Sequence, residues 1–357
     1  MRFIFKWILR LLLLFVSVFG GLLAFSTITD FHPEPESEEK LSLEGKAGKI
    51  EGDTFTVLIW NIGYAGLGAE MDFFNDGGKM VRSTEEQHAK FLGGIKGFIA
   101  SMRDSVDFFL LQEVDKNSKR SYYSNQQDTL AAALGGFISC FALNYDVKFV
   151  PVPFAFPYKP YGKTYGGLLN YSRFTPETSL RLQYPGGFDW PTRLYMLDRC
   201  ALEQKFKLPG GKELLIVNTH NTAYDATGEI KKLELQYIKK RYEAEVKNGN
   251  YVIIGGDWNQ VPPGLSSTHF NAKMPEGYTP QAVTAAQFPE GFGVSYDGKT
   301  PTNRSNDTVY KIGESYTTLI DYFVHSPNVE VISVRGIDLQ FKDSDHQPVV
   351  MKFCLKP

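Results

Sequence analysis

Several apolar runs of this chain, each typical of a buried β-strand, end in polar side chains able to bind a cation or move a proton. Such ends occur at Glu113, His220 and Asp257, and the pair Asp345-His346 comes just before the last apolar run. Carboxylates buried side by side are costly unless a cation or a proton neutralises them. The pattern therefore predicts a metal-assisted catalytic site built from strand ends.

Asp257 and Asn259 follow the run 251–254 through two glycines, which let the backbone turn sharply and a ligand approach closely. Alternate residues at a strand end point the same way, so Trp258 is expected to face into packing. Asp257 can then orient a water or accept its proton, while Asn259 donates to a phosphate oxygen. Gly-Asp-x-Asn is also a common turn, which is the alternative interpretation.

Glu113 and Asn61 are the predicted metal-binding residues from the first two catalytic strands. Magnesium prefers hard oxygen ligands and keeps several waters, which suits a carboxylate where a strand becomes a loop. The Asn61 amide is expected to bind the ion directly or through water. A surface acid at a strand end is the alternative for Glu113.

Two histidines, His346 and His220, are candidates for the site, and a neighbouring carboxylate would favour a catalytic role. His346 follows Asp345, and Asp321 lies on another strand-like run, so a carboxylate is available to set the tautomer and raise the basicity of the imidazole. His220 ends its own strand and is followed by Asn221. A lone histidine at such a position is more often structural than functional.

Composition allows one large domain and excludes a strongly basic protein. The chain has 357 residues, 43% of them hydrophobic and 14% aromatic, with a formal net charge of -2. Segment 1–26 has three basic residues and no acid, segment 30–53 has eight acids against three lysines, and the body is neutral. Non-specific nucleic-acid binding usually needs a basic surplus, which this body lacks.

The three cysteines, Cys140, Cys200 and Cys354, lie in apolar runs without the spacing of a zinc site. They are expected to be buried thiols, with a disulfide between two of them as an alternative if the body is exported.

Residues 1–29 predict a transmembrane anchor, with a cleaved signal peptide and a buried core helix as alternatives. Three basic residues precede the uncharged run 11–29, which as a helix spans about 28 Å. The positive flank places the body on the periplasmic or extracellular side, or leaves it secreted if the signal is cleaved. Residues 30–53 are expected to be a solvated acidic linker, and residues 54–357 the catalytic domain.

The body alternates short apolar runs with amphipathic stretches, which predicts an α/β fold with two sheets. Helices are expected at 85–102, 126–134 and 229–247, the first capped by Ser83 with Glu86. Two long loops, 63–78 and 262–304, are expected to be functional. The predicted strands are 57–62, 108–113, 137–143, 166–172, 199–206, 214–220, 251–256, 319–325, 329–334 and 347–355.

Six motifs in order resemble the endonuclease/exonuclease/phosphatase superfamily related to DNase I, over residues 55–355. They are Trp60-Asn61, Gln112-Glu113, Asn218-Thr219-His220, Gly256-Asp257-Trp258-Asn259, Ile320-Asp321-Tyr322 and Ser344-Asp345-His346-x-Pro348-Val349. The resemblance implies a four-layered α/β sandwich with the site at one edge of two packed sheets. Asn221 and the insertion 63–78 depart from the family pattern where substrate should bind.

By that resemblance, Glu113 binds Mg²⁺, or Mn²⁺ in its place, with Asn61 nearby and Asp345 at the metal edge. Asp257 activates or aligns the attacking water, and Asn259 and His220 hold phosphate oxygens. His346, oriented by Asp321, stabilises the transition state or moves a proton.

The resemblance thus implies a monomeric Mg²⁺-dependent phosphodiesterase or phosphatase acting on a lipid head group or a small phosphodiester. The alternatives are a secreted or membrane-tethered nuclease acting on DNA or RNA, and a non-catalytic binding protein on the same fold.

Overall fold

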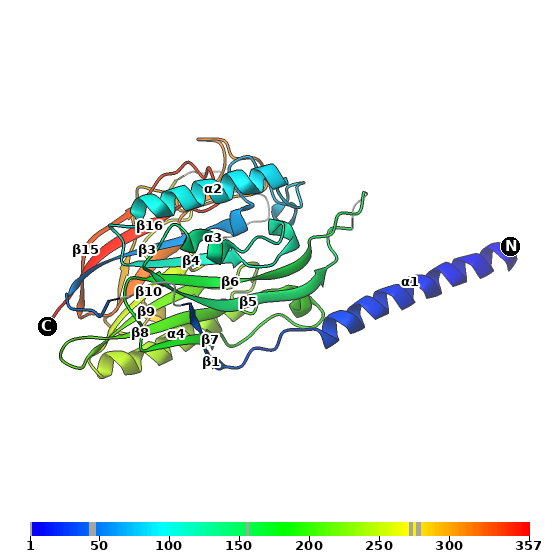
Figure 1. The fold of residues 1–357 in the computed structure, drawn as a ribbon. Coiled ribbons are helices and arrows are strands. Elements are labelled where there is room, and N and C mark those ends of the chain that lie inside the picture. Colours follow the sequence, from blue (N-terminus) through cyan, green and yellow to red (C-terminus); the bar gives the residue numbers. More distant parts are fainter. Residues whose placement is uncertain (1, 43–47, 155–156, 271–273, 276–279) are drawn as a thin grey trace.

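Two β-sheets pack face to face between layers of helix in the computed structural model, which describes residues 2–42, 48–154, 157–270, 274–275 and 280–357 (Figure 1). Each sheet has seven strands among these residues. The β3 sheet contains, in spatial order, β15 (Val329–Gly336), β16 (Val349–Leu355), β3 (Thr54–Asn61), β4 (Phe108–Asp115), β6 (Gly162–Ser172), β5 (Ile138–Val150) and β2 (Leu41–Ser42).

The second sheet is named here the β10 sheet. Each of the two sheets has a parallel pair of strands near its centre. The β10 sheet contains β1 (Glu36–Glu38), β7 (Thr178–Gln183), β8 (Cys200–Lys207), β9 (Glu213–His220), β10 (Tyr251–Asp257), β14 (Asp321–His325) and β11 (Gly293–Ser295). The parallel pairs are β3 with β4 and β9 with β10. Two further strands, β12 (Asn303–Arg304) and β13 (Thr317–Thr318), form a small antiparallel pair.

The helices cover the outer faces of the sheets. Helices α2 (Glu85–Met102) and α3 (Gln126–Ala131) lie over the β3 sheet, and α4 (Glu229–Lys247) lies over the β10 sheet. The order of layers is helix, sheet, sheet, helix, so the prediction of a four-layered α/β sandwich is confirmed.

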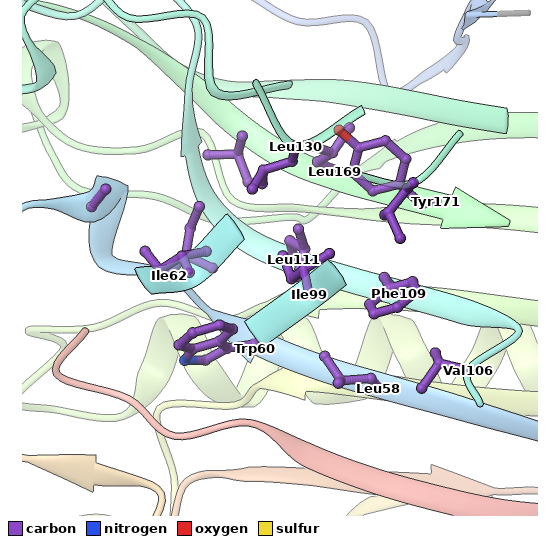
Figure 2. Packing of buried hydrophobic residues seen from close by; sticks show 14 of the residues in the cluster. Leu58, Trp60, Ile62, Ile99, Val106, Phe109, Leu111, Leu130, Leu169 and Tyr171 are labelled. Carbon is purple, nitrogen blue, oxygen red and sulfur yellow. The ribbon is translucent and has the colours of Figure 1, made fainter. Parts of the chain in front are cut away.

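Strand periodicity divides the core into layers. Leu58 and Trp60 of β3 pack toward α2 and α3 in the cluster of Figure 2, whereas Val57 and Ile59 pack against the β10 sheet. Successive side chains of a strand point to opposite faces, so Asn61 continues the face of Val57 and Ile59. The apolar space between the sheets therefore ends at a polar residue.

All ten predicted strands are present, and most of them are longer than expected. The sequence reasoning missed the edge strands β1, β2 and β11 and the strand β7 beside β1, which are short or contain many polar residues. The expected loop 262–304 contains β11, which pairs with β14, and β12. Helices α2 and α4 match their predicted bounds, and α3 ends three residues early.

The N-terminal segment has the apolar helix that the sequence predicts but differs from the expected solvated linker. Helix α1 (Arg2–Ile28) is long and apolar enough to cross a membrane, and its apolar window has no buried residue, which argues against a core helix. Residues 36–38 and 41–42 instead add strands to both sheets, pairing with β7 and β5. Residues 36–38 and 41–42 are therefore part of the body, because extended polar backbone can complete the hydrogen bonds of an open sheet edge.

The three cysteines are free thiols; Cys140 and Cys200 are buried as expected, whereas Cys354 is half-buried. Burial raises the pKa of Cys140 to about 12 and that of Cys200 to about 11, so both are protonated at neutral pH.

The capping box of α2 lies one residue later than predicted. Thr84 accepts a hydrogen bond from the Gln87 backbone at 3.2 Å, and the Gln87 side chain accepts from the Thr84 backbone at 2.9 Å. Ser83 is buried, and its hydroxyl has no hydrogen-bond partner among the described residues.

Substituting Thr84→Ala removes a helix cap and is expected to lower the free energy of unfolding by about 1 kcal/mol. Chemical denaturation of the variant and the wild type measures the difference. Ser83→Ala is the matched control and should change stability by less than about 0.5 kcal/mol, because it deletes a hydroxyl without a partner. The reverse order of effects would contradict this cap.

Candidate active site

One carboxylate oxygen, Oδ2 of Asp257, is the point at which the strand ends meet. Asn61 donates from Nδ2 to it at 3.0 Å. The Nε2 atoms of His220 and His346 lie 3.4 and 3.6 Å from the same oxygen. Asp257 is only 1% exposed. Side chains separated by up to 285 positions in the sequence therefore surround a single buried oxygen.

The register of the sheets explains this convergence. Asp257 pairs with His220 on one side and with Asp321 on the other, so three functional residues lie in one row across the β10 sheet. Ile253 of β10 and Phe323 of β14 pack between the sheets, and residues two apart share a face. Asp257 and Asp321 consequently point into the space between the sheets, toward Asn61.

Two glycines allow close approach at this point, Gly255 between the two sheets and Gly256 between the neighbouring strands β10 and β9. A Cβ atom on Gly255 would lie 2.8 Å from the Ile59 side chain, and one on Gly256 would lie 2.0 Å from the Thr219 carbonyl oxygen. Gly256 also has a φ of +148°. Larger residues would separate the strands that carry the site.

Glu113 reaches the site through an irregularity in β4. Strand β4 shifts register against β6 between Leu111 and Val114, and Glu113 has a left-handed backbone with a φ of +53°. In a regular strand Glu113 would face away from Gln112, which points between the sheets. The bulge turns Glu113 so that its Oε1 accepts from Asn61 Nδ2 at 3.1 Å and lies 4.0 Å from His220 Nε2.

The Asp321 carboxylate holds His346, and the side-chain amide of Asn303 lies beside the other ring nitrogen. Its Nδ1 lies 2.8 Å from Asp321 Oδ2, and its Nε2 lies 3.0 Å from the side-chain nitrogen of Asn303. The hydrogen bond to Asp321 fixes the proton on Nδ1 and directs Nε2 toward Asp257. Asp321 thus has the orienting position that the sequence predicted.

Electrostatics assigns different protonation states to the two histidines. Burial lowers the pKa of His220 well below its usual range, so this imidazole is neutral. Burial also opposes a charge on His346, but the carboxylates of Asp321 and Asp257 outweigh it and raise its pKa to about 10. His346 is therefore a cation at neutral pH.

The carboxylates at the centre of the site have raised pKa values. Burial raises the pKa of Asp257 to about 6 and also raises that of Glu113. With Asp321 and Asp345 beside them, the acids outnumber the single cationic histidine. A divalent cation would offset this excess of negative charge, so the residues present fit a metal ion.

Two predicted polar residues already have partners inside the protein. Asn61 presents its amide nitrogen to Glu113 and Asp257, while its oxygen accepts from the Gly63 backbone at 3.0 Å. Asn259 donates from its side chain to the Asn221 carbonyl at 2.9 Å. In this arrangement Asn61 holds the two acids in place, which differs from the direct metal ligand that the sequence suggested.

Asp345 lies at the rim of the site with residues that the sequence reasoning missed. Its Oδ2 accepts from Asn306 at 2.7 Å, and the same Asn306 amide lies 3.3 Å from Asp76, a residue of the insertion 63–78. Asn306 and Asn303 lie in or next to the long loops expected to be functional. A lone asparagine in a loop carries no pattern of its own, so only the loop length could have drawn attention to them.

Other residues of the motifs do not face the site but hold the strands that carry it. Gln112 donates to Asn218 at 2.7 Å, and Asn218 donates to the Leu111 carbonyl at 3.0 Å, which joins the two sheets. Trp258 is fully buried and stacks on Tyr322, as expected.

Comparisons with known proteins agree with this arrangement. A family model described as the Endonuclease/Exonuclease/phosphatase family matches residues 60–346. No curated protein sequence matches the chain significantly.

Three solved structures illustrate the likeness in fold. An endonuclease/exonuclease/phosphatase from Beutenbergia cavernae is 17% identical, with a TM-score of 0.54, and the match covers 85% of this chain and 72% of that one. ANGEL2, described as a 2',3'-cyclic phosphatase, is 15% identical, with a TM-score of 0.51 and coverages of 90% and 99%. D. rerio TDP2 complexed with single strand DNA product is 14% identical, with a TM-score of 0.50 and coverages of 84% and 98%.

Replacing Asp321→Asn removes the charge that most favours protonation of His346, so the pKa of His346 should fall from about 10 toward the usual value of about 6.5. Titration of the imidazole nitrogens by NMR measures this change. Asp345→Asn is the control and should lower the pKa less, because Asp345 makes the smaller contribution. An unchanged pKa in Asp321→Asn would disprove the proposed pairing.

Proposed function

The chain belongs to the endonuclease/exonuclease/phosphatase family and is a phosphoester hydrolase, and we propose that it uses Mg²⁺ and an in-line attack of water on phosphorus. The observation that carries this proposal is the convergence of Asn61, His220 and His346 on the buried Asp257 carboxylate. Such a group of acid, amide and imidazole is suited to activating water and to stabilising charge on phosphoryl oxygens.

In the proposed reaction Asp257 orients the attacking water and accepts its proton. A carboxylate with a pKa of about 6 is ionised at neutral pH but still basic enough to take a proton. Cationic His346 donates to a phosphoryl or leaving oxygen. Neutral His220 and the amide of Asn259 donate to the remaining phosphoryl oxygens.

The metal would be held at the mouth of the site by Glu113, with Asp345 beside it. Asn61 supports the Glu113 carboxylate by donating a hydrogen bond to it. When bound, the cation supplies positive charge that polarises the phosphoester and offsets the charge developing on its oxygens. We propose Mg²⁺ as this ion because its site would consist of hard oxygen ligands, with Mn²⁺ as the substitute.

For the substrate we propose a lipid head group or a small phosphodiester. The body has equal numbers of basic and acidic residues from residue 54 onward, whereas non-specific nucleic-acid binding relies on a basic surplus. A membrane-tethered nuclease acting on DNA or RNA is the second candidate, and the single strand DNA product in D. rerio TDP2 favours it.

We place the catalytic domain, residues 54–357, outside the cytoplasmic membrane as a monomer. This placement is supported by α1, a 27-residue apolar helix whose only charged residues are basic and lie in its N-terminal part. Residues 1–29 then act as an anchor, or as a signal if they are cleaved. Residues 30–53 connect this segment to the domain and also contribute strands to its sheets.

A binding protein without catalytic activity, built on the same fold, is the alternative from another class. Such a protein is expected to have lost acids or imidazoles from its former site. Here Glu113, Asp257, His346 and Asp321 are all present and in contact range, which supports catalysis.

Asp257→Asn and His346→Ala should each lower hydrolysis at least about a thousandfold while leaving the circular dichroism spectrum near that of the wild type. The assay is a panel of sphingomyelin, phosphoinositides, DNA, RNA and a simple phosphodiester, each with EDTA or with Mg²⁺. Glu314→Gln, a change in an exposed ion pair, is the control. Full turnover by either variant would refute its assigned role.

The pH dependence of kcat/KM should show a loss of activity as the pH falls through about 6. The pKa of Asp257 is raised to that value, and protonation below it removes the carboxylate that accepts the proton of water. Asp76→Asn is the matched control, because burial raises the pKa of Asp76 to about 6 as well. If the loss of activity at low pH disappears in Asp76→Asn, it reports the protonation of Asp76, and the role assigned to Asp257 is contradicted.

A further inference from the structure

Helix α1 is fixed to the body at its C-terminal end. The Ser26 hydroxyl lies 3.0 Å from the Tyr195 hydroxyl, and Trp190 donates from Nε1 to Thr27 Oγ1 at 3.2 Å. Asp30 forms an ion pair with Arg193 at 3.6 Å. The body therefore begins directly where the apolar helix ends, and no free tether separates the two.

The segment that receives α1 lies at the catalytic edge of the sandwich. It joins the end of β7 to the start of β8, where Ala201 pairs with Thr219, the neighbour of His220. Tyr145 of β5 donates to the Tyr195 carbonyl at 3.1 Å. Helix α1 consequently leaves the molecule from the edge that carries the active site, and the chain's C-terminus lies at the opposite end (Figure 1).

The hairpin of β5 and β6 extends beyond this edge toward the side of α1. Gly166 pairs with both Asp115 and Tyr145, so the rest of the hairpin lies past the end of β4. It carries Phe154 and Tyr158, which are 70% and 51% exposed and stack on each other with ring centres 6.3 Å apart. Trp190, beside the end of α1, is 53% exposed.

These three aromatic residues, named here the interfacial rim, have the composition of a membrane-contacting surface. Tryptophan and tyrosine are enriched at bilayer interfaces, where one end of the ring is apolar and the other hydrated. The hairpin also carries the exposed Lys159, which would attract anionic lipid head groups, whereas the exposed Lys148 is paired with Asp146 at 2.8 Å.

We propose that the interfacial rim lies at the boundary between head groups and acyl chains of the bilayer that α1 spans, so that the catalytic edge faces the membrane surface. This inference rests on the proposed function in taking α1 as a retained anchor. It narrows the substrate to phosphoesters at the head-group plane, because an edge held there meets lipid head groups before it meets polymers in solution.

Quenching by brominated lipid tests the orientation. The full chain with Cys354→Ser is reconstituted into phosphatidylcholine vesicles that contain brominated acyl chains, and single cysteines carry a bimane fluorophore. Phe154→Cys and Asp189→Cys report on the rim, and Lys247→Cys, at the far end of α4, is the control. Cys140 and Cys200 are buried and stay unlabelled.

Bimane at positions 154 and 189 should be quenched at least about threefold more than bimane at position 247, because quenching requires contact with the acyl chains. Equal quenching at all three positions, or none at any, would overturn the proposal. Hydrolysis of a soluble phosphodiester by the same labelled proteins tests the proposed function independently. Hydrolysis without differential quenching rejects only the orientation, and quenching without hydrolysis rejects only the function.

Discussion

The burial of one carboxylate governs the architecture of this protein. Asp257 is 1% exposed, and a buried charge of this kind needs hydrogen bonds and opposite charge around it. Asn61 and His346 supply them from the ends of two distant strands, and the pairing of β10 with β9 and β14 brings His220 and Asp321 into the same row. The two sheets must pack closely for these contacts to form. Gly255 allows that approach, so fold and site depend on the same constraint.

Strand periodicity explains how much of the site could be predicted from sequence. Asn61, Asp257 and His220 end regular strands, so an apolar run followed by a polar residue was enough to place them at one edge of the sandwich. Glu113 reaches the site only through a bulge and a left-handed backbone, which its apolar neighbours do not encode. Asn303 comes from a long loop, and its position depends on the tertiary contacts of that loop. The strands β1 and β2 were missed because polar edge strands resemble solvated chain.

The attachment of α1 connects the proposed anchor with the active site. A flexible acidic spacer would have let the catalytic domain turn freely above a membrane. Residues 36–42 instead complete both sheets, and Ser26 and Asp30 contact the loop beside the catalytic edge. The site, the aromatic hairpin and the apolar helix therefore share one end of the molecule. The fold positions the acids and histidines of the site. The attached N-terminal segment fixes the orientation of the catalytic edge relative to α1.

Diffraction from crystals soaked in Mn²⁺, recorded at a wavelength where manganese scatters anomalously, tests the central claim most directly. The account predicts an anomalous peak within about 2.5 Å of a Glu113 carboxylate oxygen, close to Asp257 and Asp345. The same soak of Glu113→Gln crystals should show a weaker peak or none. Manganese bound only at a distance from these strand ends, or with equal strength in the Glu113→Gln variant, would contradict the account.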